Sequence, residues 1–325
     1  MIDGERGDRM SEPSGAAPAA TLAVDERVPA ARPAVVVRRR RPLRPARVVL
    51  HVFLTLAMLG FLAPLALAVY ASLRPYAETS ELGYFSLPRK LTLHYYVQVF
   101  REGDLQKYFL NTLYVAVPAV LLTLFLASFV AFCIARLRVR GGLALLVVFT
   151  AGNLLPPQVL VTPLYQMYKS IPLPESLSSS LTLYDSYLGL VAIHVAFQVG
   201  FCVFVLTNYM HTIPDEITEA AVMDGAGAFR QYWQVTLPLC RPALAALATL
   251  EFTFIYNDFL YALVLMSTGD KLPVTSALNN LRGQFFTDYN LLAAGSVVVA
   301  LPTVLVFLLL QRHFIAGLTL GANKG

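Results

Sequence analysis

Six long apolar runs dominate this sequence and restrict what the chain can fold into. Each run carries few or no charges and reaches the length of about 20 residues that a helix needs to cross membrane hydrocarbon. Lipid offers backbone polar groups no partner, so such runs are expected to be helices, in which these groups bond to each other. The sequence predicts an all-α, polytopic integral membrane protein with six transmembrane helices, at residues 48–73, 108–135, 141–168, 186–210, 243–266 and 291–311.

Composition supports this class and argues against others. Of the 325 residues, 57% are hydrophobic and 14% are charged, with a mean hydropathy of +0.60, unlike a soluble domain. The net charge of +5 comes from basic residues beside apolar runs, so membrane topology explains it and no nucleic-acid partner is expected. Cys133, Cys202 and Cys240 form no CxxC pair and are expected to be packing thiols.

Basic residues indicate how the chain enters the membrane. Residues 1–47 lack periodicity and are expected to form a disordered, basic cytoplasmic tail whose arginines also suit anionic lipid headgroups. The apolar run that follows is too long for a cleaved signal peptide. An N-terminus inside, as the positive-inside rule predicts, puts the turn with Arg136, Arg138 and Arg140 inside as well. The mixed charge of the external segment 74–107 argues mildly against this orientation.

The segment 214–242 is the one long stretch of mixed polarity between apolar runs. Pro214 and the two acids after it suit a helix start, and Gly225 suits a left-handed stop. A second helix with a bulky face, including Tyr232 and Trp233, is expected to end at Pro238. Each helix holds about 10 residues, too few to be stable alone in water, so both are expected to dock on something.

Polar residues inside the apolar runs are costly in lipid and mark a candidate translocation path. Glu251 and Asp258 lie seven residues apart and are expected to share a helix face. Two interpretations stay open for such groups: a hydrated path whose polar groups hold a polar solute, or hydrogen bonds that fasten the helices. His194 is expected to be a packing residue, and the role of Glu251 stays open. The candidate path residues are Asn153, Gln158, Asn257, Asp258 and Tyr261.

Motifs for other chemistry are absent from the sequence. It has no G-x-x-x-x-G-K-[ST], so this chain is not expected to bind ATP. The five histidines have no metal-ligand spacing, and no G-x-S-x-G or H-E-x-x-H indicates hydrolysis. We therefore expect neither an enzyme nor a metal or cofactor site.

The pattern E-A-A-x-x-x-G followed by L-P resembles the coupling loop of ABC-importer permease subunits. Stretches elsewhere resemble the carbohydrate, maltose-type branch of this binding-protein-dependent transport family: Asn111-Thr112, LLPPQVLVTPLY, YNDFLYALVL and the ending HFIAGLTLGANKG. Trp233, Asn323 and a Ser-rich insertion at 177–183 depart from the family pattern. The matched coupling residues are Glu219, Ala220, Ala221, Asp224, Gly225, Ala226, Leu237 and Pro238.

This resemblance implies a set of partners. Two permeases are expected to pair with each other and with two ATP-binding subunits that hold Mg-ATP, while an extracellular or periplasmic binding protein delivers the sugar. The loop 267–290 is then expected to meet the binding protein through Asn279, Asn280, Arg282 and Gln284. The tail is expected to face the ATPase through Gly321, Lys324 and Gly325.

The sequence thus predicts a permease subunit of an ATP-driven importer of a di- or oligosaccharide in a bacterial plasma membrane, with both termini cytoplasmic. A tail at 1–47 precedes a six-span domain at 48–312, and a second tail follows at 313–325. Two alternatives stay open. One is a permease for another solute, such as a polyol or glycerol phosphate, and the other is a secondary transporter, which usually shows internal repeats.

Overall fold

The computed structural model describes residues 45–102, 104–281 and 287–319, and all regular elements in these ranges are helices. The chain divides into two compact units, residues 1–55 and 56–325. Helix α1 (Pro45–Ser72) begins with a proline, whose missing N–H is harmless at a first helical position. Residues 45–47, which we assigned to the tail, are therefore helical, while residues 1–44 lie outside the described ranges.

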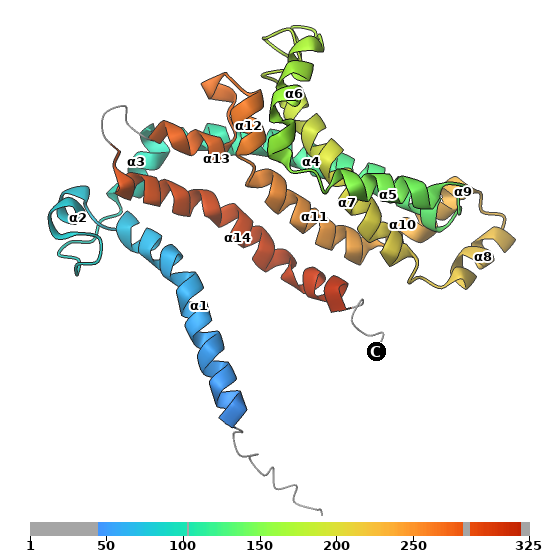
Figure 1. Cartoon of the computed structure of the whole chain (residues 1–325), viewed down its shortest axis with the longest axis horizontal. Coiled ribbons are helices and arrows are strands. Elements are labelled where there is room, and N and C mark those ends of the chain that lie inside the picture. Colours follow the sequence, from blue (N-terminus) through green and yellow to red (C-terminus); the bar gives the residue numbers. More distant parts are fainter. Residues whose placement is uncertain (1–44, 103, 282–286, 320–325) are drawn as a thin grey trace, which may run out of the picture. The chain divides into compact units, whose positions relative to one another are not determined.

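Four single helices are long and apolar enough to cross a membrane (Figure 1). They match the first, second, fourth and sixth predicted runs within a few residues at most ends. The exception is the last helix, which continues through residues that we assigned to the C-terminal tail. The four helices are α1, α4 (Leu105–Ala135), α7 (Tyr187–Met210) and α14 (Tyr289–Thr319).

The third predicted run is a broken pair of helices. Helices α5 (Gly142–Gly152) and α6 (Pro157–Ser170) meet at an angle of 96°. Pro156 and Pro157 explain the break, because a proline removes a helical hydrogen bond and disfavours helix in the residue before it. A second bent pair, with an angle of 73°, joins residues 228–239 to α11 (Arg241–Tyr256). The described part of the chain thus has four spans, or up to six if each pair crosses once.

The fifth predicted run is not one helix. Helix α11 ends at Tyr256, and a short helix, α12 (Leu260–Leu265), follows the break. The carboxylate of Asp258 accepts hydrogen bonds from the backbone N–H groups of Tyr261 and Ala262. An aspartate favours this capping role over a helix interior. Our prediction that Glu251 and Asp258 share one helix face is therefore wrong.

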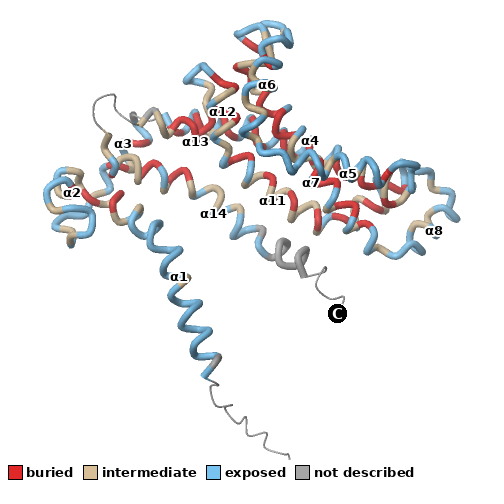
Figure 2. Tube along the Cα trace, in the orientation of Figure 1, coloured by how far each residue is buried: buried red, intermediate tan, exposed pale blue. Residues whose placement is uncertain are grey.

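The core of the unit 56–325 lies where α4 and α7 run side by side (Figure 1). Figure 2 shows the buried residues along these helices. Helix α4 contributes small residues that let the two backbones approach, as is typical of helix pairs in membranes. Helix α11 packs against α4 and α14. The fully buried small residues are Ala116, Ala119, Ala127 and Ala131.

Short helices occupy the connections near the start of α4: α2 (Tyr76–Leu82), α3 (His94–Glu102), η2 (Gly269–Lys271), α13 (Val274–Ala277) and η3 (Leu278–Leu281). The side-chain amide of Asn111 donates to the carbonyl oxygens of Asp270 and Leu272, at 2.8 and 3.1 Å. The hydroxyl of Thr112 accepts from Val274 N at 2.8 Å. The Asn-Thr pair in α4 therefore fixes the connection that follows α12.

Candidate functional site

The predicted two-helix segment is present. Helix α8 (Asp215–Met223) follows Pro214 and contains no buried residue. It stops before Gly225, whose φ of +74° lies in the left-handed region that glycine adopts most easily. The turn is then closed by hydrogen bonds from Ala226 N to Ala221 O at 2.9 Å and from Gln231 Nε2 to Ala226 O at 2.6 Å. Gln231 is buried, so the turn is fixed from its inner side.

A helical stretch follows this turn: α9 (Ala228–Arg230), η1 (Gln231–Thr236) and α10 (Leu237–Leu239). The middle part is a π-helix, a rare conformation that is frequent at functional sites. The hydroxyl of Tyr232 lies 2.8 Å from that of Ser128 in α4, and its ring packs on Phe129 and Phe132. The helical stretch ends at Leu239, one residue after Pro238, which agrees with the predicted end of this helix.

Arg136, at the C-terminal end of α4, holds the start of α8. Its guanidinium donates to the Asp215 carboxylate at 2.6 Å and to the carbonyl oxygens of Met210 and Ile213. Only 3% of this side chain is exposed, against 77% for Arg138, which also donates to Asp215. The basic turn after α4 and the segment 214–242, which we call the coupling segment, therefore lie at the same end of the helix bundle.

The outer side of the segment is apolar and exposed. Met223 and Phe229 are 87% and 74% exposed, and the Phe229 ring stacks on that of Trp233. Half of the predicted coupling residues are exposed, and the other half are partly buried. The exposed ones are Glu219, Ala220, Asp224 and Gly225; the partly buried ones are Ala221, Ala226, Leu237 and Pro238. Two short helices with a fixed turn and an apolar outer face are suited to docking on another protein.

Of the predicted path residues, the structure brings Asp258 and Tyr261 together around His194. The Asp258 carboxylate lies 3.7 Å from His194 Nε2, and the Tyr261 ring packs edge-on against the His194 ring at 5.7 Å. The buried Tyr261 hydroxyl has no hydrogen-bond partner within the described residues. Such an unsatisfied buried group needs an explanation, and a water or a ligand hydroxyl would supply one.

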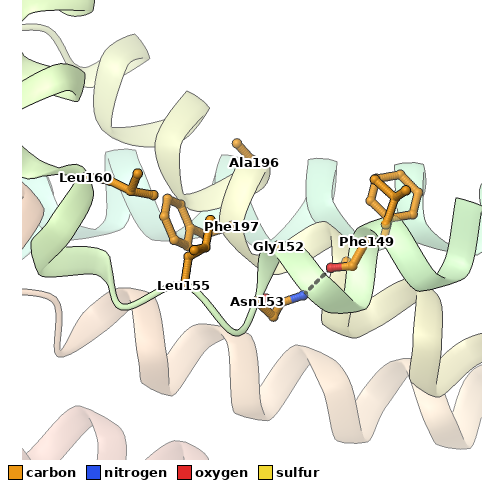
Figure 3. A pocket seen from close by; sticks show the side chains of 9 residues that line it. Phe149, Gly152, Asn153, Leu155, Leu160, Ala196 and Phe197 are labelled. Carbon is orange, nitrogen blue, oxygen red and sulfur yellow. Dashed lines mark hydrogen bonds between the residues drawn. The ribbon is translucent and has the colours of Figure 1, made fainter.

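Asn153 lies apart from that cluster, in a cavity of about 260 Å³ at the bend between α5 and α6 (Figure 3). Its side-chain amide donates to Phe149 O at 3.0 Å. Gln158 is exposed beyond this cavity, and the amide of the exposed Asn257 donates to Thr253 O at 2.8 Å. The five candidate path residues therefore do not form one constellation.

Sequence reasoning missed two buried polar contacts. The fully buried Glu251 accepts from the Cys202 thiol at 3.3 Å, a partner that its place in an apolar run did not indicate. Asp185 accepts from Ser267 N and from both the backbone and the hydroxyl of Thr268, at 2.6 to 2.9 Å. No local motif marks these pairs, since each joins residues about 50 to 80 positions apart. Within the described residues, no group of His, Cys, Asp or Glu could hold a metal ion.

The remaining predicted sites are described only in part. Asn279 and the backbone of Asn280 lie in η3, while Arg282 and Gln284 fall outside the described residues. The tail residues Gly321, Lys324 and Gly325 also fall outside them.

A multi-span helical bundle with an exposed two-helix loop at one end defines a membrane permease. Comparison with known families then specifies the class: residues 119–319 match the model of the binding-protein-dependent transport system inner membrane component, and the chain belongs to this family. It is thus the permease component of an ABC transporter and not the ATPase subunit, as predicted. The secondary-transporter alternative is excluded by this family.

Individual relatives agree with this family. The alpha-glucoside transport system permease protein of Rhizobium meliloti is 34% identical over 73% of this chain, which spans 62% of that relative. The osmoprotective compounds uptake permease protein of Synechocystis is 31% identical over 83% of this chain and 90% of its own length. A crystal structure of a bacterial ABC transporter involved in alginate import has the same fold, with a TM-score of 0.68 and 22% identity over 82% of this chain and 95% of that one.

Proposed function

We propose that this chain forms half of the translocation path of an ATP-driven importer of a di- or oligosaccharide. Family membership gives the class of transporter, and the alpha-glucoside relative supports a sugar as the solute. The observation that carries the coupling role is the exposed α8, held by the left-handed turn at Gly225 and by Arg136. Closure of an ATP-bound partner pair would draw two such loops together and shift the bundle toward its outward-open state.

The partners follow from this proposal. A second permease completes the path, two ATP-binding subunits hold Mg-ATP, and a binding protein delivers the solute on the opposite side. This chain needs no cofactor of its own. The cytoplasmic placement of both termini is supported by the shared position of the basic turn and α8, since positive charge favours the cytoplasmic side. The loop 267–290 and the C-terminal tail stay proposed contacts with the binding protein and the ATPase.

Asp258 and Tyr261 are the path residues that we favour. Their cluster joins α12 to α7, and the Tyr261 hydroxyl lacks a partner within the described residues. A sugar hydroxyl that reaches this site in another state of the transporter would satisfy it. Asn153, Gln158 and Asn257 have less support, because each of them is exposed.

Gly225→Asp tests the coupling role. An aspartate there adds a negative charge to the turn that the ATPase must approach closely, so we expect ATP-dependent sugar uptake by the reconstituted transporter to be abolished. Gly225→Asn is the matched control, because asparagine has the same shape and tolerates positive φ without adding charge. Normal uptake by a well-expressed Gly225→Asp transporter would refute the proposal.

A panel of solutes tests the cargo. Uptake with and without ATP should be measured for disaccharides, oligosaccharides, polyols and glycerol phosphate. The osmoprotective-compound relative favours a small compatible solute as the second candidate. ATP-dependent uptake of polyols alone would establish that alternative and remove the oligosaccharide.

A further inference from the structure

A second exposed apolar surface lies between α1 and α4, near the start of α4 and thus at the opposite end of this helix from the coupling segment. The apolar stripe begins at Leu93, directly before α3, and continues with Val97 and Phe100 in this helix. The three residues share one helix face, because positions i, i+4 and i+7 lie on the same side of a helix. These side chains are 66%, 48% and 52% exposed. Phe85 and Leu87, in the loop before α3, are 86% and 88% exposed.

The other sides of α3 are different in kind. Tyr95 and Val99 are buried in a cluster with Ala294 and Val298 of α14, so the packing of α3 does not use the apolar stripe. His94 and Arg101, which lie three and four residues from Val97, form an exposed polar edge directly beside the stripe. The helix therefore has one face for the protein core, one for water and one that is apolar yet exposed.

Two hydrogen bonds hold the start of α3 beside the end of α1. Thr92 N donates to Leu73 O at 2.8 Å, and the hydroxyls of Tyr96 and Ser72 lie 2.7 Å apart. Ser72 is the last residue of the membrane span α1. On the other side, α3 ends three residues before α4 begins at Leu105. The stripe is thus held beside the ends of two candidate spans.

We propose that Phe85, Leu87, Leu93, Val97 and Phe100 form an interfacial anchor that inserts into the lipid boundary on the side opposite the coupling segment. The neighbouring helix α1 is apolar and largely exposed, as expected of a span in contact with lipid. A short helix whose exposed surface is divided between an apolar stripe and a polar edge is typical of helices that lie in this zone. Arg89 and Lys90, both exposed in the same loop, are suited to phosphate groups at the same depth.

The anchor has a mechanical consequence. Because Tyr95 and Val99 pack on α14, lipid contact by α3 would hold that end of α14 at a fixed depth while the opposite end of the bundle moves. This role is independent of the identity of the transported solute.

Spin-label accessibility tests the proposal in the complete transporter, reconstituted in lipid vesicles. Cys133→Ser removes the partly exposed thiol, and Cys202 and Cys240 are fully buried and should stay unlabelled. Nitroxide labels are then placed at Val97→Cys or Phe100→Cys. The matched controls are His94→Cys and Arg101→Cys, on the polar side of the same helix.

Oxygen concentrates in lipid, whereas a neutral nickel chelate stays in water. We expect the ratio of oxygen to nickel collisions to be higher at positions 97 and 100 than at 94 and 101, and to fall below one at the two controls. Frequent nickel collisions at 97 and 100 would place the stripe in water and overturn the proposal. Protection from both reagents would show that a protein covers the stripe, and would overturn it equally.

Discussion

Gly200 in α7 sets how closely α5 can approach. A Cβ at this position would lie 2.6 Å from Asn153 Nδ2 and 2.7 Å from Phe149 O, and the second atom belongs to backbone that cannot rotate away. We expect Gly200→Ala to destabilise the protein by about 1–3 kcal/mol, the usual cost of overpacking. Thermal unfolding of the purified protein in detergent measures this.

Gly152→Ala is the control for this prediction, because a Cβ there meets nothing within 4 Å. Its melting temperature should match the wild type or exceed it slightly, since alanine also restricts the unfolded chain. Equal melting temperatures for both variants would contradict the close approach.

Asp185 joins two connections that are far apart in sequence. Burial alone would raise the pKa of this carboxyl, but hydrogen bonds from Thr268 and Ser267 and the charge of Lys271 together lower it below the ordinary 3.8. A lowered pKa in the folded state means that the carboxylate stabilises the fold above its ordinary pKa. This contribution is lost as the pH falls from 3.8 through the folded value.

We expect Asp185→Asn to lower stability by about 1–3 kcal/mol near neutral pH, the cost of losing hydrogen bonds to a charged acceptor. Asparagine tolerates the φ of +56° at this position, so the backbone adds no strain. The difference in melting temperature from the wild type should shrink as the pH falls below 3.8. Asp270→Asn, which removes an exposed ion pair with Lys107, should cost less than about 1 kcal/mol. A constant difference across this pH range would contradict the assignment.

At the scale of elements, a buried arginine holds the start of α8. Helix α8 buries none of its own residues, so its position comes from its turn and from the contacts of Arg136. Lysine cannot reproduce the planar fork that reaches three acceptors. We expect Arg136→Lys to speed hydrogen exchange of the α8 amides roughly tenfold, because the substitution loses about 1.5 kcal/mol of charged hydrogen bonding.

The chain supplies a matched control in Arg138, which binds the same aspartate from an exposed position. Exposed pairs contribute little, so Arg138→Lys should leave the exchange of α8 almost unchanged. If both variants accelerated exchange equally, burial of Arg136 would not be what holds the helix.

At the scale of the whole molecule, transport requires groups that meet the solute without being needed by the fold. Tyr261→Phe removes a hydroxyl that has no partner within the described residues, so stability should not fall. If this hydroxyl binds the sugar, the KM for uptake should rise. Tyr256→Phe is the opposite case, because its hydroxyl donates to Val299 O at 2.8 Å, a buried hydrogen bond that phenylalanine cannot make.

We therefore expect Tyr256→Phe to cost about 0.5–1.5 kcal/mol of stability with an unchanged KM. Uptake kinetics and thermal unfolding of both variants, measured in the same preparation, separate the two roles. An unchanged KM for Tyr261→Phe would remove this residue from the path.

Local chemistry along the chain was enough to predict the all-α membrane class, the main spans and the two short helices of the segment 214–242. Apolar runs must form helices in lipid, and a glycine after a short helix favours a left-handed stop, as at Gly225. These features depend on neighbouring residues only, so a sequence displays them directly. The same holds for the break at Pro156 and Pro157, whose position was visible although its 96° angle was not.

Tertiary structure alone decided which polar groups meet. The apolar neighbours of Asp258 favour a continuous helix, but Asp258 lies in a break between two helices. Its carboxylate caps α12 and approaches His194 of α7. Arg136, Asp185 and Glu251 likewise find partners about 50 to 80 residues away. Spacing along one helix cannot anticipate such contacts, since they depend on how separate helices pack. The sequence by itself determined which segments enter the membrane; packing between those segments determined the site.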